Sequence, residues 1–423
     1  MKITVIDTPQ ELLRIKELAE KERFLLFPIF SNEEHPIVSK LPILVLAKPL
    51  KLDEIFVIGI SHHETLNEQL FDFTIFKGSF IYNKKYFNLT KSLDLEACYY
   101  INNDEYTINL FKSQEDWRIY PIYKIVESLV DDLIEFSNYC LNLPENSRAY
   151  KFLNEITIPV LSEIEEIGLK VDENVFIEKF DNRNLIKNGL VYTQYNYLTT
   201  TGRPSNRFGG VNYSALNKSD GSRDAFISRF ENGNLYMLDY DSYHMRLIAD
   251  LIKYELPKES IHTHFAKHYF NAETVTDEMY EESKKISFKL LYGGVSEEYR
   301  HIQYFTDIEK FINKLWNIHN TNGFIEAVLS NKHIMADSKT KLFNYLIQNY
   351  ETEQNMLVLK KIFKETVSFE SMPVLYTYDS IMFDVKSGEE TEYLKVVKDI
   401  MEINGQFPVK MSVGKNYGNM QKI

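Results

Sequence analysis

The chain has 423 residues, a length typical of two or three domains of about 150 residues each. Hydrophobic residues make up 44% and charged residues 26% of the sequence, a globular composition that excludes disorder as the main state. The net charge of −13 excludes a uniformly basic nucleic-acid coat, so any contact with a polynucleotide has to come from a local patch.

The first 120 residues predict a small α/β domain. Thr8 and Glu11 form a capping box at the start of an amphipathic helix. A second helix is expected near residues 64–71. Short runs rich in β-branched and aromatic residues predict strands over residues 24–30, 43–46, 55–60 and 73–76.

Helices and then short strands follow in the middle of the chain. Helical periodicity covers residues 124–141 and 152–167, and Gly168 is expected to end the second helix as a C-cap. A helix over residues 173–187 and a strand over residues 190–197 are predicted next.

Four later segments carry residues suited to chemistry. Residues 201–205 (TGRPS) form a turn that presents Arg203, and residues 235–241 form an apolar strand that ends in carboxylates. Residues 284–293 predict a helix that ends at a glycine pair. Residues 374–385 predict a strand, a tight turn that holds Asp379, and a second strand.

The residue types in these segments favour nucleotidyl transfer. If Asp239 and Asp379 converge from their separate strands, they can hold two divalent cations about 3.5–4 Å apart, which activate a hydroxyl and stabilise phosphoryl transfer. Lysine offers a charge to a triphosphate, and aromatic rings offer a flat wall to a base and sugar. Four such residues recur at every fourth position and therefore share one helix face: Tyr280, Lys284, Phe288 and Tyr292.

In this order, the segments resemble the motifs of family A DNA polymerases, the bacterial polymerase I class. DYDSYHMRLIADL (239–251) is similar to motif A, DYSQIELR, and KKISFKLLYG (284–293) is similar to motif B, R-x3-K-x3-F-x3-YG. YDS (378–380) is similar to motif C, His-Asp-Glu. Four further similar segments are the TGR turn, IHT (261–263), NYLIQ (344–348) and VGKNY (413–417). The resemblance covers about residues 150–423.

The resemblance implies a fold of mixed α+β and α/β class. It consists of a right-hand polymerase palm with an antiparallel sheet, helical fingers and a reduced thumb, preceded by a small α/β exonuclease-like (RNase H-like) domain. The implied domains are 1–148 for the exonuclease-like part and 149–423 for the polymerase. Within the polymerase, the minimal thumb covers 149–189, the palm 190–260 and 340–423, and the fingers 261–339.

The resemblance also implies the roles of single residues. Asp239 and Asp379 would hold two Mg²⁺ ions, with help from the Tyr240 carbonyl, and Lys284 would act on the triphosphate. Phe288 would contact the sugar and base of the incoming nucleotide, and Tyr292 would close on the templating position. Residues expected to contact the DNA are Arg203, Arg223, Asn344 and Gln348.

Several positions depart from the family pattern. Tyr280 stands where motif B has arginine, so one phosphate-binding cation is missing. His244 stands where motif A has the glutamate that excludes a 2′-hydroxyl, and imidazole can either crowd a 2′ oxygen or hydrogen-bond to it. Tyr378 and Ser380 replace the histidine and glutamate of motif C. Phe288, where some relatives carry tyrosine, predicts discrimination against dideoxynucleotides.

Two absences lead to further predictions. Only 203 − 172 = 31 residues separate Asp172 from Arg203, too few for the two long antiparallel helices of a thumb, which predicts low processivity without a partner. The strand at 24–30 lacks the Asp-x-Glu that a 3′–5′ exonuclease needs to hold metal ions, which predicts no proofreading.

The sequence therefore predicts a template-directed DNA polymerase that acts in replication or repair on primer-template DNA and dNTPs. A processivity factor, helicase or primase is a candidate partner. Two alternatives stay open: a ribonucleotide-tolerant primer synthase or single-subunit RNA polymerase, prompted by His244, and a catalytically inactive DNA-binding scaffold, prompted by the substituted motifs.

The expected location is the cytoplasm of a bacterium or of a phage-infected cell. No run approaches about 18 uncharged apolar residues, so no membrane contact is expected. Cys98 and Cys140 are too few for a disulfide framework, which favours a reducing compartment. The compact build favours a replication protein of a phage or mobile element.

Overall fold

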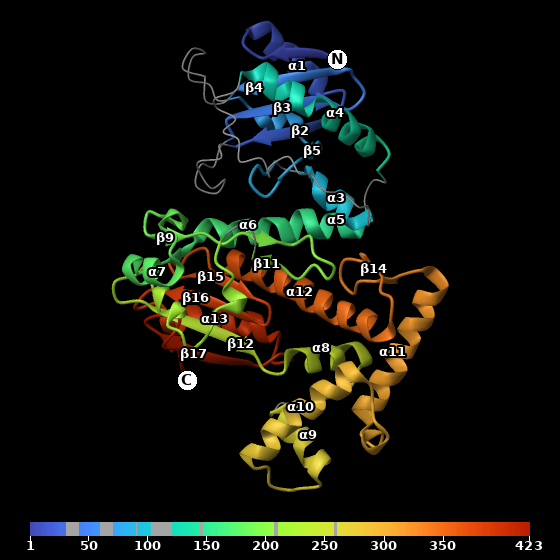
Figure 1. Cartoon of the computed structure of the whole chain (residues 1–423), viewed down its shortest axis with the longest axis vertical. Helices are drawn as coiled ribbons and strands as arrows, with labels where there is room; N and C mark the ends of the chain where they lie inside the picture. Colours follow the sequence, from blue (N-terminus) through green and yellow to red (C-terminus); the bar gives the residue numbers. More distant parts are fainter. Residues whose placement is uncertain are drawn as a thin grey trace. The chain divides into compact units, whose positions relative to one another are not determined.

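The computed structural model describes residues 1–30, 42–59, 71–89, 91–102, 121–143, 147–206, 210–257 and 260–423. These residues form two compact units, Met1–Glu166 and Ile167–Ile423 (Figure 1). Among the residues described, no helix is both long and apolar enough to span a bilayer.

The first unit is built on a mixed six-stranded sheet in the order β1-β4-β3-β2-β5-β6. Pairing of β2 with β3 and of β3 with β4 is antiparallel, and the other three pairings are parallel. The strands are β1 Lys2–Val5, β2 Phe24–Ile29, β3 Leu44–Pro49, β4 Glu54–Gly59, β5 Phe80–Ile81 and β6 Leu93–Asp94.

Helices cover both faces of this sheet, and side-chain alternation along β2 explains why. Leu25 and Phe27 belong to the core beneath α3 (Leu95–Asn102) and α4 (Ile122–Leu141), whereas Leu26 belongs to the core beneath α1 (Pro9–Ala19). Because both faces are covered, all six residues of β2 are buried.

Most predictions for this unit are confirmed. Thr8 and Glu11 form the capping box at the start of α1, and three of the four predicted strands correspond to β2, β3 and β4. The strand predicted at 73–76 is wrong: Phe73–Phe76 is a 3₁₀ turn, because the Asp72 side chain caps it by accepting a hydrogen bond from the Thr74 amide. The helix expected near 64–71 lies, except for its last residue, outside the described residues.

The first unit ends with one long helical segment made of α5 (Arg148–Phe152), a π-helical turn (Leu153–Thr157) and α6 (Ile158–Ile167). Lys85 Nζ lies 2.5 Å from Glu165 Oε1, and both side chains are buried. The Asp94 amide donates to Asn154 Oδ1 at 2.7 Å. These long-range contacts attach residues 148–166 to the first compact unit, Met1–Glu166.

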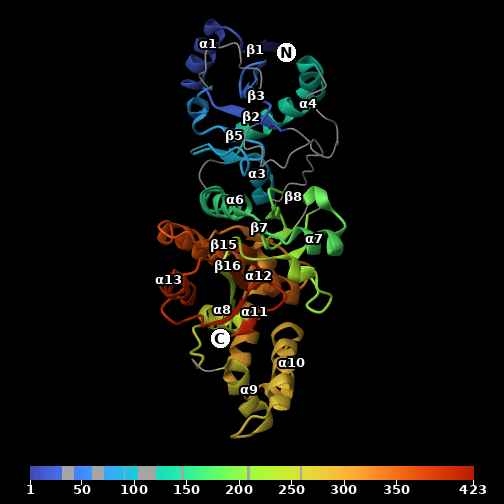
Figure 2. The same ribbon diagram turned by 90° about the vertical axis from the view of Figure 1, so that its left-hand side faces the viewer.

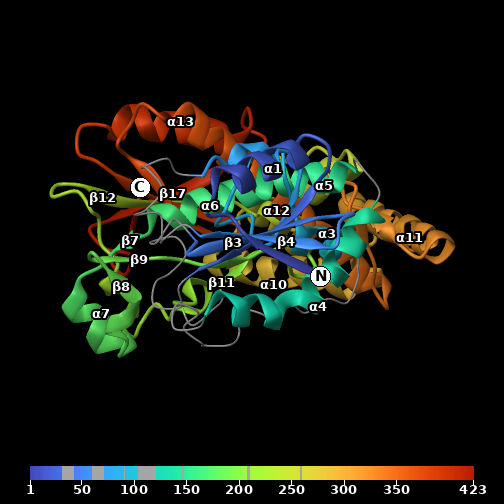
Figure 3. The same ribbon diagram turned by 90° about the horizontal axis from the view of Figure 1, so that it is seen from above.

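The second unit contains an antiparallel five-stranded sheet in the order β15-β16-β12-β17-β18. Helix α13 (Glu390–Glu402) lies beside β17 (Figure 3). It also packs against α12 (Lys339–Glu365), which itself packs on α8 (Tyr243–Ile252). The strands are β12 Asn234–Tyr240, β15 Met372–Thr377, β16 Ser380–Val385, β17 Val409–Gly414 and β18 Gln421–Lys422.

Three helices of the second unit pack around a core that they share with α8 and α12. Helices α9 (Ile261–Phe270) and α10 (Asp277–Gly293) lie side by side (Figure 2), and α11 (Gln303–Asn322) packs against α8 and α12. Phe265, Leu290 and Phe305 are buried between them. A short hairpin, β13 (Ile325–Glu326) and β14 (His333–Ile334), follows α11.

The segment between Gly168 and Arg203 is short and irregular. Gly168 ends α6 with a φ of +64°, as predicted. It is followed by α7 (Glu173–Phe180) and by a small sheet in the order β7 (Leu169–Lys170), β9 (Leu190–Val191) and β8 (Ile186–Lys187). The helix predicted over 173–187 is wrong beyond Phe180, because Asp181 adopts a left-handed conformation that ends it. No pair of long antiparallel helices occurs in 169–203, all of which is described.

The remaining short strands complete this segment. The strand predicted over 190–197 is divided in two: β9 (Leu190–Val191) pairs with β7 (Leu169–Lys170) and β8 (Ile186–Lys187), and β10 (Tyr195–Asn196) pairs with β11 (Ser205–Asn206). Each part has its own partner, so one continuous strand does not form.

Candidate active site

Asp239 and Asp379 lie next to each other at one edge of the antiparallel sheet. Asp239 is near the end of β12 and pairs with Ser380, the first residue of β16. Asp379 occupies the two-residue turn between β15 and β16, and its carbonyl accepts a hydrogen bond from the Tyr240 amide at 3.0 Å. Both aspartates line one cleft of about 560 Å³.

The turn that holds Asp379 is supported from two sides. Tyr378 has a φ of +59°, which is uncommon for a non-glycine residue. Asn355 of α12 donates a hydrogen bond to the Tyr378 carbonyl at 2.6 Å, and the Arg203 guanidinium lies 3.9 Å from the centre of the Tyr378 ring. These contacts fix the direction in which the turn presents Asp379.

Desolvation and neighbouring negative charge raise the pKa of both carboxyl groups. Both side chains are exposed to the cleft, but the cleft walls displace water around them. This desolvation, followed by repulsion from Asp379, raises the pKa of Asp239 to about 6. Desolvation, followed by the charge of Glu351, raises the pKa of Asp379. A divalent cation between the two carboxylates would relieve this repulsion.

Several cations line the same cleft. Lys410 of β17 pairs with Asp239 in the strand register, and its charge lowers the pKa of that carboxyl, although desolvation and Asp379 outweigh it. Arg223 donates to the Leu216 carbonyl at 2.9 Å, and its guanidinium lies 4.4 Å from the Tyr417 ring centre. The complete set of cationic residues in the lining is Lys218, Arg223, Lys410 and Lys422.

Asp241, two residues beyond Asp239, is engaged by cations. Lys410 Nζ forms an ion pair with its carboxylate, and Arg246 Nη2 lies 3.7 Å from it. Arg246 also donates to the Asp241 carbonyl at 3.1 Å. These contacts were not predicted from the sequence, because strand register and helix packing bring Lys410 and Arg246 to Asp241.

The four predicted residues of α10 share one face, but none of them lines the cleft that holds the aspartates. Lys284 Nζ lies 2.7 Å from Glu281 Oε1 and 4.5 Å from the centre of the Tyr280 ring. Phe288 is half exposed, and its ring is nearly parallel to that of Tyr292 at 6.3 Å between centroids. The helix therefore presents a lysine and an exposed aromatic wall.

His244 of α8 contacts residues of both α10 and α12. Its Nδ1 contacts the Tyr292 hydroxyl, and its Nε2 lies 3.2 Å from Glu351 Oε1. Arg203 Nη2 lies 3.0 Å from the other oxygen of Glu351. Tyr240, in contrast, is a core residue whose ring stacks on Tyr243 at 4.0 Å.

One face of α12 points to this region. Its residues at intervals of four, three and four positions are Asn344, Gln348, Glu351 and Asn355. Asn344 and Gln348 were predicted as DNA contacts and are half-buried. Glu351 and Asn355 were not predicted, although their spacing from the NYLIQ segment places them on the same face and could have indicated them.

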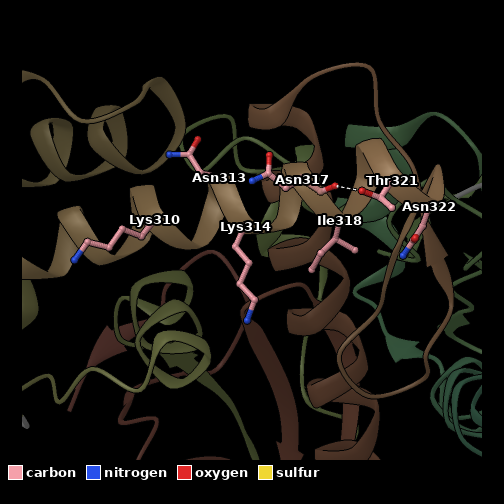
Figure 4. A pocket seen from close by; sticks show the side chains of 7 residues that line it. All are labelled: Lys310, Asn313, Lys314, Asn317, Ile318, Thr321 and Asn322. Carbon is pink, nitrogen blue, oxygen red and sulfur yellow. Dashed lines mark hydrogen bonds between the residues drawn. The ribbon is translucent and has the colours of Figure 1, made fainter.

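A second hollow lies away from these residues, on α11 (Figure 4). It measures about 640 Å³ and contains none of the predicted site residues. Its lining comes from one face of a single helix: Lys310, Asn313, Lys314, Asn317, Ile318, Thr321 and Asn322. It is not part of the candidate site.

The donor set at the cleft suits a hard divalent cation. Asp239 and Asp379 offer carboxylate oxygens, the ligands that Mg²⁺ prefers. Their pKa values are raised by desolvation first and by neighbouring negative charge second, and a cation would neutralise that charge. No group of three or more metal-binding side chains occurs in the part of the chain that the structure describes. Two carboxylates leave room for substrate oxygens in the ion's coordination sphere.

The fold is that of a nucleic-acid polymerase domain. It matches the POL domain of Pol1 from M. smegmatis, solved in complex with a DNA primer-template and dNTP, with a TM-score of 0.73 and 13% identity, over 99% of each chain. Residues 168–421 match the family described as DNA polymerase family A, and the chain belongs to that family. The predicted family and fold class are thus confirmed.

Curated relatives are consistent with this assignment. The DNA polymerase I of Streptococcus pneumoniae strain R6 is 22% identical over 275 residues, which cover 55% of this chain and 31% of that protein. The DNA polymerase I of strain TIGR4 matches over the same shares at the same identity. The matched region thus spans about a third of the length of these relatives.

Proposed function

We propose that the chain is a template-directed DNA polymerase that extends a primer with dNTPs. The observation that carries this proposal is the placement of Asp239, on β12, and Asp379, in the turn before the neighbouring strand β16, along one cleft. The primer 3′-oxygen forms a bond to the α-phosphorus while the bond from that phosphorus to the pyrophosphate oxygen breaks, and pyrophosphate leaves. Two Mg²⁺ ions would activate the hydroxyl and neutralise charge on the phosphates.

The surrounding residues would position the substrates. Asp239, Asp379 and the Tyr240 carbonyl would hold the ions. Lys284 would leave Glu281 to bind the triphosphate, because a triphosphate carries more charge than one carboxylate. The aromatic wall would receive the base and sugar through Phe288 and Tyr292, next to Tyr280 and His244. The residues that would contact DNA are Arg203, Arg223, Asn344 and Gln348.

Primer extension tests this proposal. Wild-type protein is expected to extend a primed template with dNTPs only when Mg²⁺ is present, and Asp239→Ala and Asp379→Ala are expected to abolish extension. Asp337→Ala, which removes an exposed carboxylate paired with Lys341, is the matched control and should stay active. Wild-type protein that binds the primed template without extending it would refute the proposal and favour the inactive scaffold.

We also propose that the enzyme lacks proofreading and has low processivity. Strand β2 consists of apolar residues and a proline and offers no carboxylate for a metal ion. Residues 169–203 contain no long helix pair that could grip the duplex, so few phosphate contacts are expected there. A processivity factor, helicase or primase in the cytoplasm would compensate.

Each of these two proposals has its own test. Excision of a mismatched 3′ end by wild-type protein would contradict the first proposal. Synthesis of hundreds of nucleotides per binding event in the presence of a DNA trap, without added proteins, would contradict the second.

A further inference from the structure

Glu351 is a buried carboxylate that the family motifs do not assign. It lies on α12, and only 1% of its side chain is exposed. Its two oxygens face Arg203 at 3.0 Å and His244 at 3.2 Å. Both contacts lie at ion-pair distance but outside hydrogen-bond geometry. Their strength is therefore electrostatic.

A carboxylate buried in this way has to be compensated. An isolated buried charge is strongly unfavourable, and an arginine and an imidazole next to it reduce that cost. The Glu351 charge in turn acts on its surroundings: it helps to raise the pKa of Asp379, after desolvation, and of Tyr292, also after desolvation. The charge of Glu351 therefore acts both on the turn that holds Asp379 and on Tyr292 of α10.

His244 occupies the position where the motif A pattern has a glutamate, so this chain has an imidazole where a carboxylate is expected. Glu351 brings a carboxylate to the same place from a different helix. The Tyr292 hydroxyl contacts Nδ1 of the ring and Glu351 lies beside Nε2, so a neighbour occupies each ring nitrogen. The ring is therefore held in one orientation between α8, α10 and α12.

We propose that Glu351 is a positioning residue that holds His244 against Tyr292, and that the fixed imidazole selects deoxyribonucleotides over ribonucleotides. This inference rests on the proposed polymerase function. The metal ions would bind at Asp239 and Asp379, and the base would pack against the ring of Phe288. The sugar of the nucleotide would therefore lie between the ions and that ring. His244 lies in that interval, because it stands in the first turn of α8, shortly after Asp239 on β12, and its ring contacts Tyr292, the neighbour of Phe288.

The surroundings of the two ring nitrogens decide between the two roles that the sequence left open for His244, crowding a 2′-hydroxyl or hydrogen-bonding to it. The Tyr292 hydroxyl contacts Nδ1, and Nε2 is buried beside Glu351 although it makes no hydrogen bond, so neither nitrogen is open to a 2′-hydroxyl and the ring crowds that hydroxyl instead of binding it. A ribonucleotide would then lose a hydrogen bond to water without a replacement. This loss corresponds to roughly 10–100-fold lower kcat/KM for a ribonucleotide than for the matching deoxyribonucleotide.

The test measures kcat/KM for a dNTP and the matching rNTP in wild-type and variant protein. Glu351→Ala is expected to lower the dNTP/rNTP ratio by about tenfold or more, mainly through a higher kcat/KM for the rNTP. Glu351→Gln keeps an oxygen beside Nε2 and should retain part of the ratio. His244→Ala should lower the ratio at least as much as Glu351→Ala.

Two further variants keep the test decisive. Glu353→Gln changes a buried carboxylate on the same helix that binds the Ser330 and Leu329 amides, so it should leave the ratio unchanged. Tyr292→Phe removes the hydroxyl at Nδ1 with little change in packing, and should lower the ratio even if the Glu351 variants fail to fold. The KM and kcat for dNTP separate a loss of positioning from a general structural defect.

The outcomes distinguish this inference from the proposed function. Wild-type protein that extends with dNTPs, together with folded Glu351 and Tyr292 variants that keep the wild-type ratio, overturns the inference alone. Wild-type protein that discriminates by less than about twofold also overturns it. Absence of extension with either kind of nucleotide overturns the proposed function and the inference with it.

Discussion

Replacing Asp239 by asparagine is expected to stabilise the metal-free protein at alkaline pH. In the native state the pKa of Asp239 is raised from 3.8 to about 6 by desolvation and then by Asp379. The charged carboxylate therefore destabilises the fold above about pH 6. The native state binds more protons than the unfolded state between pH 4 and 6, so this contribution to stability falls as the pH rises through that range.

The size of the stabilisation by Asp239→Asn follows from the change in the pKa of Asp239 on folding. The difference between a pKa of 3.8 and one of about 6 corresponds to at most about 3 kcal/mol. Because the carboxylate is exposed to water in the cleft, screening reduces this figure, and about 1 kcal/mol is expected for Asp239→Asn at pH 8. The difference should fall to about half near pH 5, where native Asp239 is largely protonated.

Urea unfolding at pH 8 and pH 5 in the presence of EDTA measures these differences. Added Mg²⁺ should stabilise the wild type more than Asp239→Asn, because the ion replaces the repulsion between Asp239 and Asp379 by attraction. Asp337→Asn, at an exposed carboxylate paired with Lys341, serves as the control. An Asp239→Asn variant that is less stable than wild type at pH 8 without metal would refute the argument from repulsion.

Three further predictions concern α10 and the first unit. Lys284→Ala should raise the KM for dNTP in steady-state kinetics by about 10–100-fold, because one charge-assisted contact to the triphosphate is lost. Lys285→Ala, which changes an exposed lysine on the same helix, should leave this KM near the wild-type value. Phe288→Tyr should increase incorporation of dideoxynucleotides relative to deoxynucleotides in a competition assay, and equal incorporation of both by the wild type would contradict the role of Phe288. Glu165→Ala should destabilise the first unit by about 3–5 kcal/mol in urea unfolding, because it removes the carboxylate that pairs with the buried Lys85 ammonium. A decrease in the free energy of unfolding below about 1 kcal/mol would show that this ion pair does not stabilise the unit.

Local patterns in the sequence predicted those features that depend on a few neighbouring residues. The capping box of Thr8 and Glu11, the C-cap at Gly168 and the hairpin around Asp379 are confirmed, because each depends on backbone preferences within a few positions. The order of the motifs predicted the polymerase family. The failures were also local in origin: the Asp72 side chain and the left-handed Asp181 override apolar periodicity at 73–76 and beyond Phe180.

Contacts between distant segments could not be predicted in this way. The sequence alone determined the identity and order of the residues proposed to carry the chemistry, including Asp239 and Asp379. Only the tertiary structure decided that Lys410 lies opposite Asp239 and that Glu351 reaches His244 from α12, since strand register and helix packing join positions separated by more than a hundred residues. No local pattern in the sequence specifies these two contacts, because each results from how the strands and helices of the whole unit pack together.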